Sequence, residues 1–179
     1  VLTEKLPAEP KPRVVPEASR SYPHTLREVY QHSLFHGPML EGITAIEGWS
    51  EEGIVTKLRV APNPEEWMEK PLRPSWLSDP LVLDAAFQVM ILWTIQQFGS
   101  PSLPTAGGAY RQYRERFPLD GVVMKAAARK SGAHTVKADF EFLDQHGRVV
   151  ARLDGYECVM NPALAEAFRR RTVEGTAGA

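Results

Sequence analysis

The sequence predicts one α+β domain in which a curled antiparallel sheet wraps around one long buried helix. Three observations predict it: an apolar run at residues 81–99, a strand hairpin pattern before that run, and several strand patterns after it. A chain of 179 residues with 43% apolar composition is also long enough to bury a sizeable core.

The central helix has clear start and stop signals. Asp79 is a good N-cap, and Pro80 suits the first helical position. The helix should continue to Phe98 and stop at Gly99, with Pro101 just beyond. Because the run is apolar on most sides, we expect a buried helix rather than a surface helix.

The strand patterns lie on both sides of this helix. Before it, residues 42–49 and 54–60 read as a hairpin joined at residues 50–53, and residues 25–31 as a short helix. Residues 61–78 carry four prolines and read as an irregular loop. After the helix, strands are expected at residues 109–117, 121–128, 135–143 and 148–160.

The flanks of the chain differ from this middle part. Residues 1–23 contain five prolines and predict an extended linker. The folded domain should therefore occupy residues 24–162. Residues 163–179 include three consecutive arginines and end in small residues, so we expect a flexible basic tail.

Composition argues against several classes of function. A net charge of −1 and a pI near 6.6 give no electrostatic case for binding nucleic acid or an anionic membrane. The apolar run is interrupted and too short for a bilayer span. Cys158 is the sole cysteine, so no intrachain disulfide can form and a reducing, cytoplasmic location is expected. The sequence shows no metal-ligand spacing, no phosphate-binding glycine loop and no Gly-x-Ser-x-Gly elbow.

Asp84 is the main indication of chemistry. It is the one formally charged residue in the apolar run, and burying an unpaired charge is costly. Gln88 lies four residues on, so its amide can reach the carboxyl group on the same helix face. From the residues alone, a structural Asp that is hydrogen-bonded to backbone or a tyrosine is the alternative.

Three segments taken together resemble the dehydratase domains of polyketide synthases. Residues 34–39 (Leu-Phe-His-Gly-Pro-Met), followed by Gly42-Ile43, resemble the family's (Y/F)-(Y/H)-G-P-x-F-x-x-(I/L) segment. Residues 79–88 (Asp-Pro-Leu-Val-Leu-Asp-Ala-Ala-Phe-Gln) resemble its H-P-x-x-L-D-A-x-x-Q motif, with Asp79 where the family usually has His. Residues 102–105 (Ser-Leu-Pro-Thr) resemble the Leu-Pro segment that follows the helix.

The resemblance implies a hotdog fold and a role in catalysis. The family's dehydratases are double hotdogs, and this chain resembles the second, C-terminal half. The Asp of the motif acts there as general acid and the Gln orients it, which assigns these roles to Asp84 and Gln88. The family's base is a histidine in H-x-x-x-G-x-x-x-x-P of the first hotdog, and no histidine of this chain has Gly four residues later.

The resemblance also implies substrate contacts. His36, Gly37 and Pro38 belong to a segment that lines the acyl tunnel in the family, and Leu103 and Pro104 belong to the Leu-Pro segment. For His36, a structural loop histidine and a substitute base are the alternatives.

The function expected from the resemblance is half of a lyase. A 3-hydroxyacyl thioester, carried on the phosphopantetheine arm of an acyl carrier protein, would lose water to give a 2,3-enoyl thioester. No bound cofactor or metal is expected, and the site would be incomplete without an N-terminal hotdog half or a second copy in a homodimer. The alternatives are a non-catalytic hotdog that binds acyl chains or serves as a scaffold, and a single-hotdog acyl thioesterase.

Overall fold

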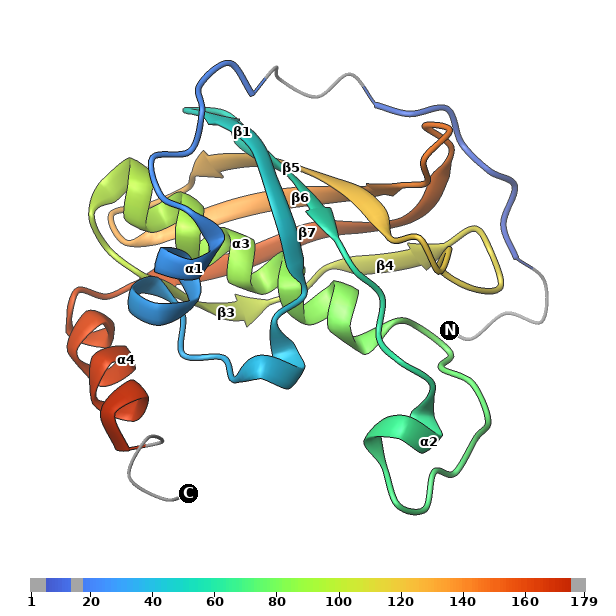
Figure 1. Ribbon diagram of the computed structural model, residues 1–179. Coiled ribbons are helices and arrows are strands. Elements are labelled where there is room, and N and C mark those ends of the chain that lie inside the picture. The colour runs from blue at the N-terminus through green and yellow to red at the C-terminus, as the bar shows by residue number, and fades with distance from the viewer. Residues whose placement is uncertain (1–5, 14–17, 175–179) are drawn as a thin grey trace.

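A seven-stranded antiparallel sheet curves around one long helix, as the sequence predicts (Figure 1). This computed structural model describes residues 6–13 and 18–174, with side chains to residue 168. The elements before the long helix are α1 (Leu26–Glu28), a π-helical turn (Val29–Ser33), a 3₁₀ turn (Pro38–Leu40), β1 (Ile43–Ser50), β2 (Gly53–Leu58) and α2 (Pro64–Trp67). The long helix and the elements after it are α3 (Pro80–Phe98), β3 (Ser102–Ala106), β4 (Ala109–Gln112), β5 (Val122–Lys130), β6 (Thr135–Leu143), β7 (Val149–Met160) and α4 (Ala163–Glu174).

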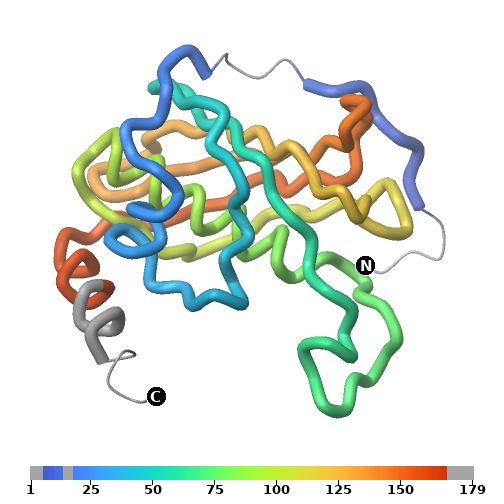
Figure 2. Tube along the Cα trace, viewed as in Figure 1, coloured from blue at the N-terminus to red at the C-terminus, as the bar shows by residue number. Residues whose placement is uncertain are grey.

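The sheet is open and has the order β1-β2-β5-β6-β7-β3, with β4 also paired to β7. β1 and β2 form the predicted hairpin, and the Cα trace shows β5, β6 and β7 running side by side behind α3 (Figure 2). β3 pairs with the last part of β7, and β4 pairs with an earlier part of the same strand. Pro104 lies on the edge strand β3, where its missing N–H costs no ladder bond to a further strand.

Helix α3 begins and ends where the sequence predicts. The side chain of Asp79 accepts a hydrogen bond from the Val82 N–H (2.9 Å), and Pro80 occupies the first turn. Gly99 ends the helix in the left-handed conformation (φ 66°), and its N–H donates to the Ile95 carbonyl. By length and composition alone its 19 residues would suffice to cross a membrane, but 61% of the most apolar window is buried inside the protein. This burial is typical of a core helix.

Aromatic contacts fix the rotation of α3 against the sheet. The Phe87 ring stacks on Tyr156 of β7 with centroids 5.3 Å apart, and Tyr156 meets Phe140 of β6 edge-on at 5.2 Å. At the other end of the helix, the Trp93 indole N–H donates to the Ser50 carbonyl (3.0 Å). Because these contacts hold one side of α3 on the sheet, the side that carries Asp84 is turned toward the segment before β1.

Two parts of the chain differ from the prediction. The strand expected at residues 109–117 stops at Gln112, because the Gln112 side-chain amide donates to the carbonyls of Arg114 and Glu115 and supports a bend there. The loop at residues 61–78 contains the one-turn helix α2, which Asn63 and Glu66 cap reciprocally.

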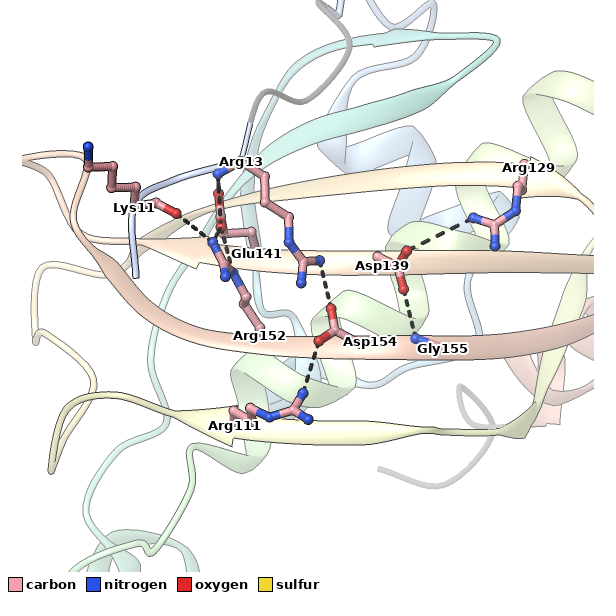
Figure 3. A network of polar contacts seen from close by, with 9 residues as sticks. All are labelled: Lys11, Arg13, Arg111, Arg129, Asp139, Glu141, Arg152, Asp154 and Gly155. Atoms are coloured by element: carbon pink, nitrogen blue, oxygen red, sulfur yellow. Dashed lines mark hydrogen bonds and ion pairs between the residues drawn. The ribbon is translucent and has the colours of Figure 1, made fainter. Parts of the chain in front are cut away.

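The proline-rich segment lies on the outer face of the sheet where it is described (Figure 3). The backbone N–H of Arg13 donates to the Glu141 carboxylate (3.1 Å), and its guanidinium pairs with Asp154 (2.6 Å). The Lys11 carbonyl accepts from Arg152, which also pairs with Glu141. Residues 6–13 are therefore fastened to β6 and β7 by polar contacts. Residues 1–5 and 14–17 of the predicted linker lie outside the described residues.

The C-terminal segment is more ordered than the sequence suggests. The tail expected at residues 163–179 forms helix α4 as far as Glu174, and residues 175–179 lie outside the described part. Phe168 of α4 is buried, and its ring packs against Phe35 with centroids 4.5 Å apart. An aromatic contact with a segment far away in sequence explains why the prediction of a frayed tail does not hold over this stretch.

Candidate active site

Asp84 and Gln88 meet on one face of α3, as their spacing predicts. The Gln88 Nε2 group donates to Asp84 Oδ2 at 2.7 Å. Gln88 is fully buried, whereas 34% of the Asp84 side chain is exposed. The carboxyl group is thus less buried than expected: it opens to the surface while its amide partner is sealed inside.

The Gln88 amide is saturated with hydrogen bonds. Besides Asp84, Nε2 donates to the Leu40 carbonyl (2.7 Å), and Oε1 accepts from the Tyr30 hydroxyl (3.1 Å). The Tyr30 oxygen in turn accepts from the Ile43 N–H (2.9 Å). Gln88 therefore joins α3 to the segment that precedes β1.

His36 lies next to the carboxyl group. Its Nε2 is 3.7 Å from Asp84 Oδ2, too long for a hydrogen bond but close enough for a strong charge interaction. The ring stacks on Phe35, and its side chain is 8% exposed. Burial lowers the pKa of His36, and the Asp84 carboxylate partly opposes this shift. We therefore expect a neutral imidazole at pH 7.

The Gly-Pro segment reaches the site through its backbone. Gly37 and Pro38 are exposed, and the 3₁₀ turn that starts at Pro38 presents the Leu40 carbonyl to Gln88. The Arg59 side chain holds this turn, because its guanidinium donates to the carbonyls of Glu41 (2.7 Å) and Met39 (3.3 Å). The turn that follows His36 is therefore clamped at its far end while its backbone contacts the amide partner of the acid.

Leu103 and Pro104 lie elsewhere. Both are on the edge strand β3 and pair with Val159 and Cys158 of β7. Leu103 is half-buried and Pro104 is exposed, and the hydrogen bonds of the Asp84 and Gln88 pair do not extend to them.

Asp79, which stands where the family usually has His, has a structural role here. Its carboxylate caps α3 and also accepts from the Ala61 N–H (3.0 Å), so it ties the loop before the helix to the first turn. Burial raises the pKa of Asp79, and the backbone N–H groups oppose this shift. In the part of the chain that the structure describes, no group of three His, Cys, Asp or Glu side chains could hold a metal ion.

Sequence reasoning missed Tyr30 and Arg59. Tyr30 lies in a predicted helix with no motif of its own, and Arg59 follows β2 with no acidic partner nearby in sequence. Their contacts are to backbone groups and to a glutamine amide, which leave no charge pattern for a sequence to reveal.

Comparisons with known proteins agree with the fold and the motifs. Residues 6–167 match the family described as polyketide synthase dehydratase N-terminal domain. One of the polypeptides of a polyunsaturated fatty acid synthase from Thraustochytrium sp. is 32% identical over 82 residues, which are 46% of this chain and 3% of that polypeptide.

Two solved structures show the same fold. The dehydratase domain from the CurJ module of curacin polyketide synthase has a TM-score of 0.63 and 19% identity, over 83% of this chain and 52% of that one. The dehydratase domain from the CurF module has a TM-score of 0.63 and 21% identity, over 86% and 54%. The chain thus spans about half the length of these dehydratase domains and has their hotdog fold. Because the family match covers most of the sequence, this chain belongs to the polyketide synthase dehydratase family.

Proposed function

We propose that this chain supplies the acid half of a 3-hydroxyacyl thioester dehydratase. The observation that carries the proposal is a partly exposed carboxyl group, Asp84, that a fully buried amide, Gln88, holds from behind. This arrangement presents one carboxyl oxygen to the surface in a fixed direction, which is what proton transfer to a bound substrate needs.

The proposed reaction is an elimination. A base removes the α-proton of the 3-hydroxyacyl thioester, and the electrons of that C–H bond form the new double bond. The bond between the β-carbon and its oxygen breaks, and the hydroxyl group leaves as water with the proton of Asp84. Asp84 is left as a carboxylate and regains a proton before the next turnover.

The base is proposed to come from a preceding hotdog. This sequence carries the motif of the acid and lacks H-x-x-x-G-x-x-x-x-P, which supports the C-terminal half, although the matched family is named for an N-terminal domain. The partners of such a half are a second hotdog, either a preceding domain or another copy of this chain, and an acyl carrier protein that delivers the substrate.

A second candidate is favoured by the 3.7 Å between His36 Nε2 and Asp84 Oδ2. A neutral imidazole can accept a proton, and burial lowers the pKa of His36 toward that state. In this version His36 is the base and the chain acts without a partner histidine.

One assay separates the candidates. The chain is incubated with a 3-hydroxyacyl pantetheine thioester, with and without added imidazole, and the enoyl product is followed by its absorbance and mass. Turnover that requires imidazole and is lost in Asp84→Asn supports the acid half. Turnover without imidazole that is lost in His36→Gln supports the second candidate.

Two results would count against both candidates. Turnover that survives Asp84→Asn would refute the acid role. A folded wild-type chain with no turnover under any of these conditions would favour the non-catalytic hotdog.

A further inference from the structure

Tyr30 lies between a backbone donor and the buried amide of Gln88. Its oxygen accepts from the Ile43 N–H (2.9 Å), and its hydroxyl donates to Gln88 Oε1 (3.1 Å). Burial raises the pKa of Tyr30 to about 12, so the hydroxyl keeps its proton at neutral pH. The hydroxyl is therefore a reliable donor to the amide oxygen.

The direction of every hydrogen bond in this relay is determined by its two ends. The Ile43 N–H can only donate, so the Tyr30 proton must point the other way, to Oε1 of Gln88. At the opposite end the Leu40 carbonyl can only accept, so it requires Nε2 of Gln88. With the amide rotated by half a turn, oxygen would face oxygen at Leu40 and both ends would lose a partner.

We propose that Tyr30 is a positioning residue for the acid: it fixes the orientation of the Gln88 amide and so places the transferable proton of Asp84 on Oδ1. The Gln88 N–H occupies Oδ2, and in the described part of the chain the polar contacts of Asp84, including that with His36, all go to Oδ2. Oδ1 is the oxygen that remains for the proton and the substrate. This inference rests on the proposed acid role of Asp84.

Removing the Tyr30 hydroxyl should loosen the relay without emptying it. In Tyr30→Phe the buried Gln88 Oε1 and the Ile43 N–H lose their partner, and the amide can turn away from Asp84. We expect kcat to fall about tenfold with little change in KM, because the substrate is still bound but the acid is no longer held.

Tyr22→Phe is the matched control. The Tyr22 hydroxyl is also largely buried, donates to a backbone carbonyl (Leu92, 3.3 Å), and has its pKa raised to about 12 by burial. This hydrogen bond lies apart from the relay, so its loss should leave kcat and the Gln88 amide unchanged.

The first test does not depend on turnover. The side-chain amide protons of Gln88 are followed by ¹H–¹⁵N NMR and by their exchange with deuterium. They should be protected in the wild type and in Tyr22→Phe, and shifted and faster to exchange in Tyr30→Phe. Unchanged Gln88 signals in Tyr30→Phe would overturn the inference. If that variant does not fold, Gln88 protons that exchange at solvent rates in the wild type would overturn it equally.

The second test is a double-mutant cycle. In a Gln88→Met background, Tyr30→Phe should lower kcat no further, because Tyr30 acts through Gln88. Independent effects of the two substitutions would indicate a merely structural Tyr30 and refute the inference. If the NMR result holds but Asp84→Asn keeps full activity, the relay exists and the proposed function has failed.

Discussion

The buried ion pair between Arg152 and Glu141 fastens the N-terminal segment to the sheet, and its removal should be costly. Both Nε and Nη2 of Arg152 donate to Glu141 Oε1, at 2.8 and 2.5 Å. The two side chains are 10% and 2% exposed. In Arg152→Met the Glu141 carboxylate would stay buried with the Arg13 N–H as its remaining described donor. The Lys11 carbonyl would also lose its partner.

The expected magnitude follows from this geometry. Breaking a buried pair by removing one partner costs about 3–5 kcal/mol, because an uncompensated charge stays inside. For a domain of this size, about 2–4 °C of Tm is lost per kcal/mol, so Tm should fall by about 6–20 °C. The double substitution Glu141→Leu with Arg152→Met removes both charges and should cost less than Arg152→Met alone.

Chemical denaturation followed by circular dichroism measures these differences. The control is Lys57→Met, which breaks the exposed pair of Lys57 with Glu47 (3.0 Å; side chains 49% and 43% exposed). That pair should contribute about 0–1 kcal/mol. If Arg152→Met costs no more than Lys57→Met, or if the double variant is the least stable, the reasoning from burial is refuted.

Two further predictions concern the neighbourhood of the site. In Asp84→Asn the pKa of His36, read from its ring protons by NMR, should fall below its wild-type value, because burial then acts without the opposing carboxylate; an unchanged or higher pKa would contradict this. Since the folded pKa of His36 is lowered, its contribution to stability is fully present above the unfolded pKa of about 6.5 and is lost as pH falls below it. Gly42→Ala should lower the free energy of unfolding by about 1–3 kcal/mol, because overpacking strains a core. The new Cβ would lie 2.7 Å from that of Ala85, whereas Gly37→Ala meets nothing within 4 Å and should be neutral in the same thermal melts.

Local signals in the sequence predicted α3 and its polar pair. The Asp79 cap, Pro80 and the left-handed Gly99 each act within one helical turn, so their effect can be read from neighbouring residues. The hydrogen bond between Asp84 and Gln88 follows from the same helical period. The strand at residues 135–143 was also predicted with its observed bounds, because strong alternation and a turn after it mark both ends.

Other features depend on partners that are distant in sequence. The edge strand β3 was recognised as a Leu-Pro segment but not as a strand, because its pairing is with β7, more than fifty residues away. The same holds for α4, where burial of Phe168 against Phe35 accompanies a helix that composition alone describes as a basic tail. Residues 6–13 were predicted as extended, but their fastening to Glu141 and Asp154 was not.

The sequence by itself therefore determined the fold class, the central helix and the identity of the acid and its amide partner. The tertiary structure decided how exposed Asp84 is, which orientation the Gln88 amide takes, and that Tyr30 and His36 stand beside them. The physical reason is range. A helical period and a cap are local, whereas the relay joins α3 to a segment some forty to sixty positions earlier through backbone N–H and carbonyl groups that every sequence has.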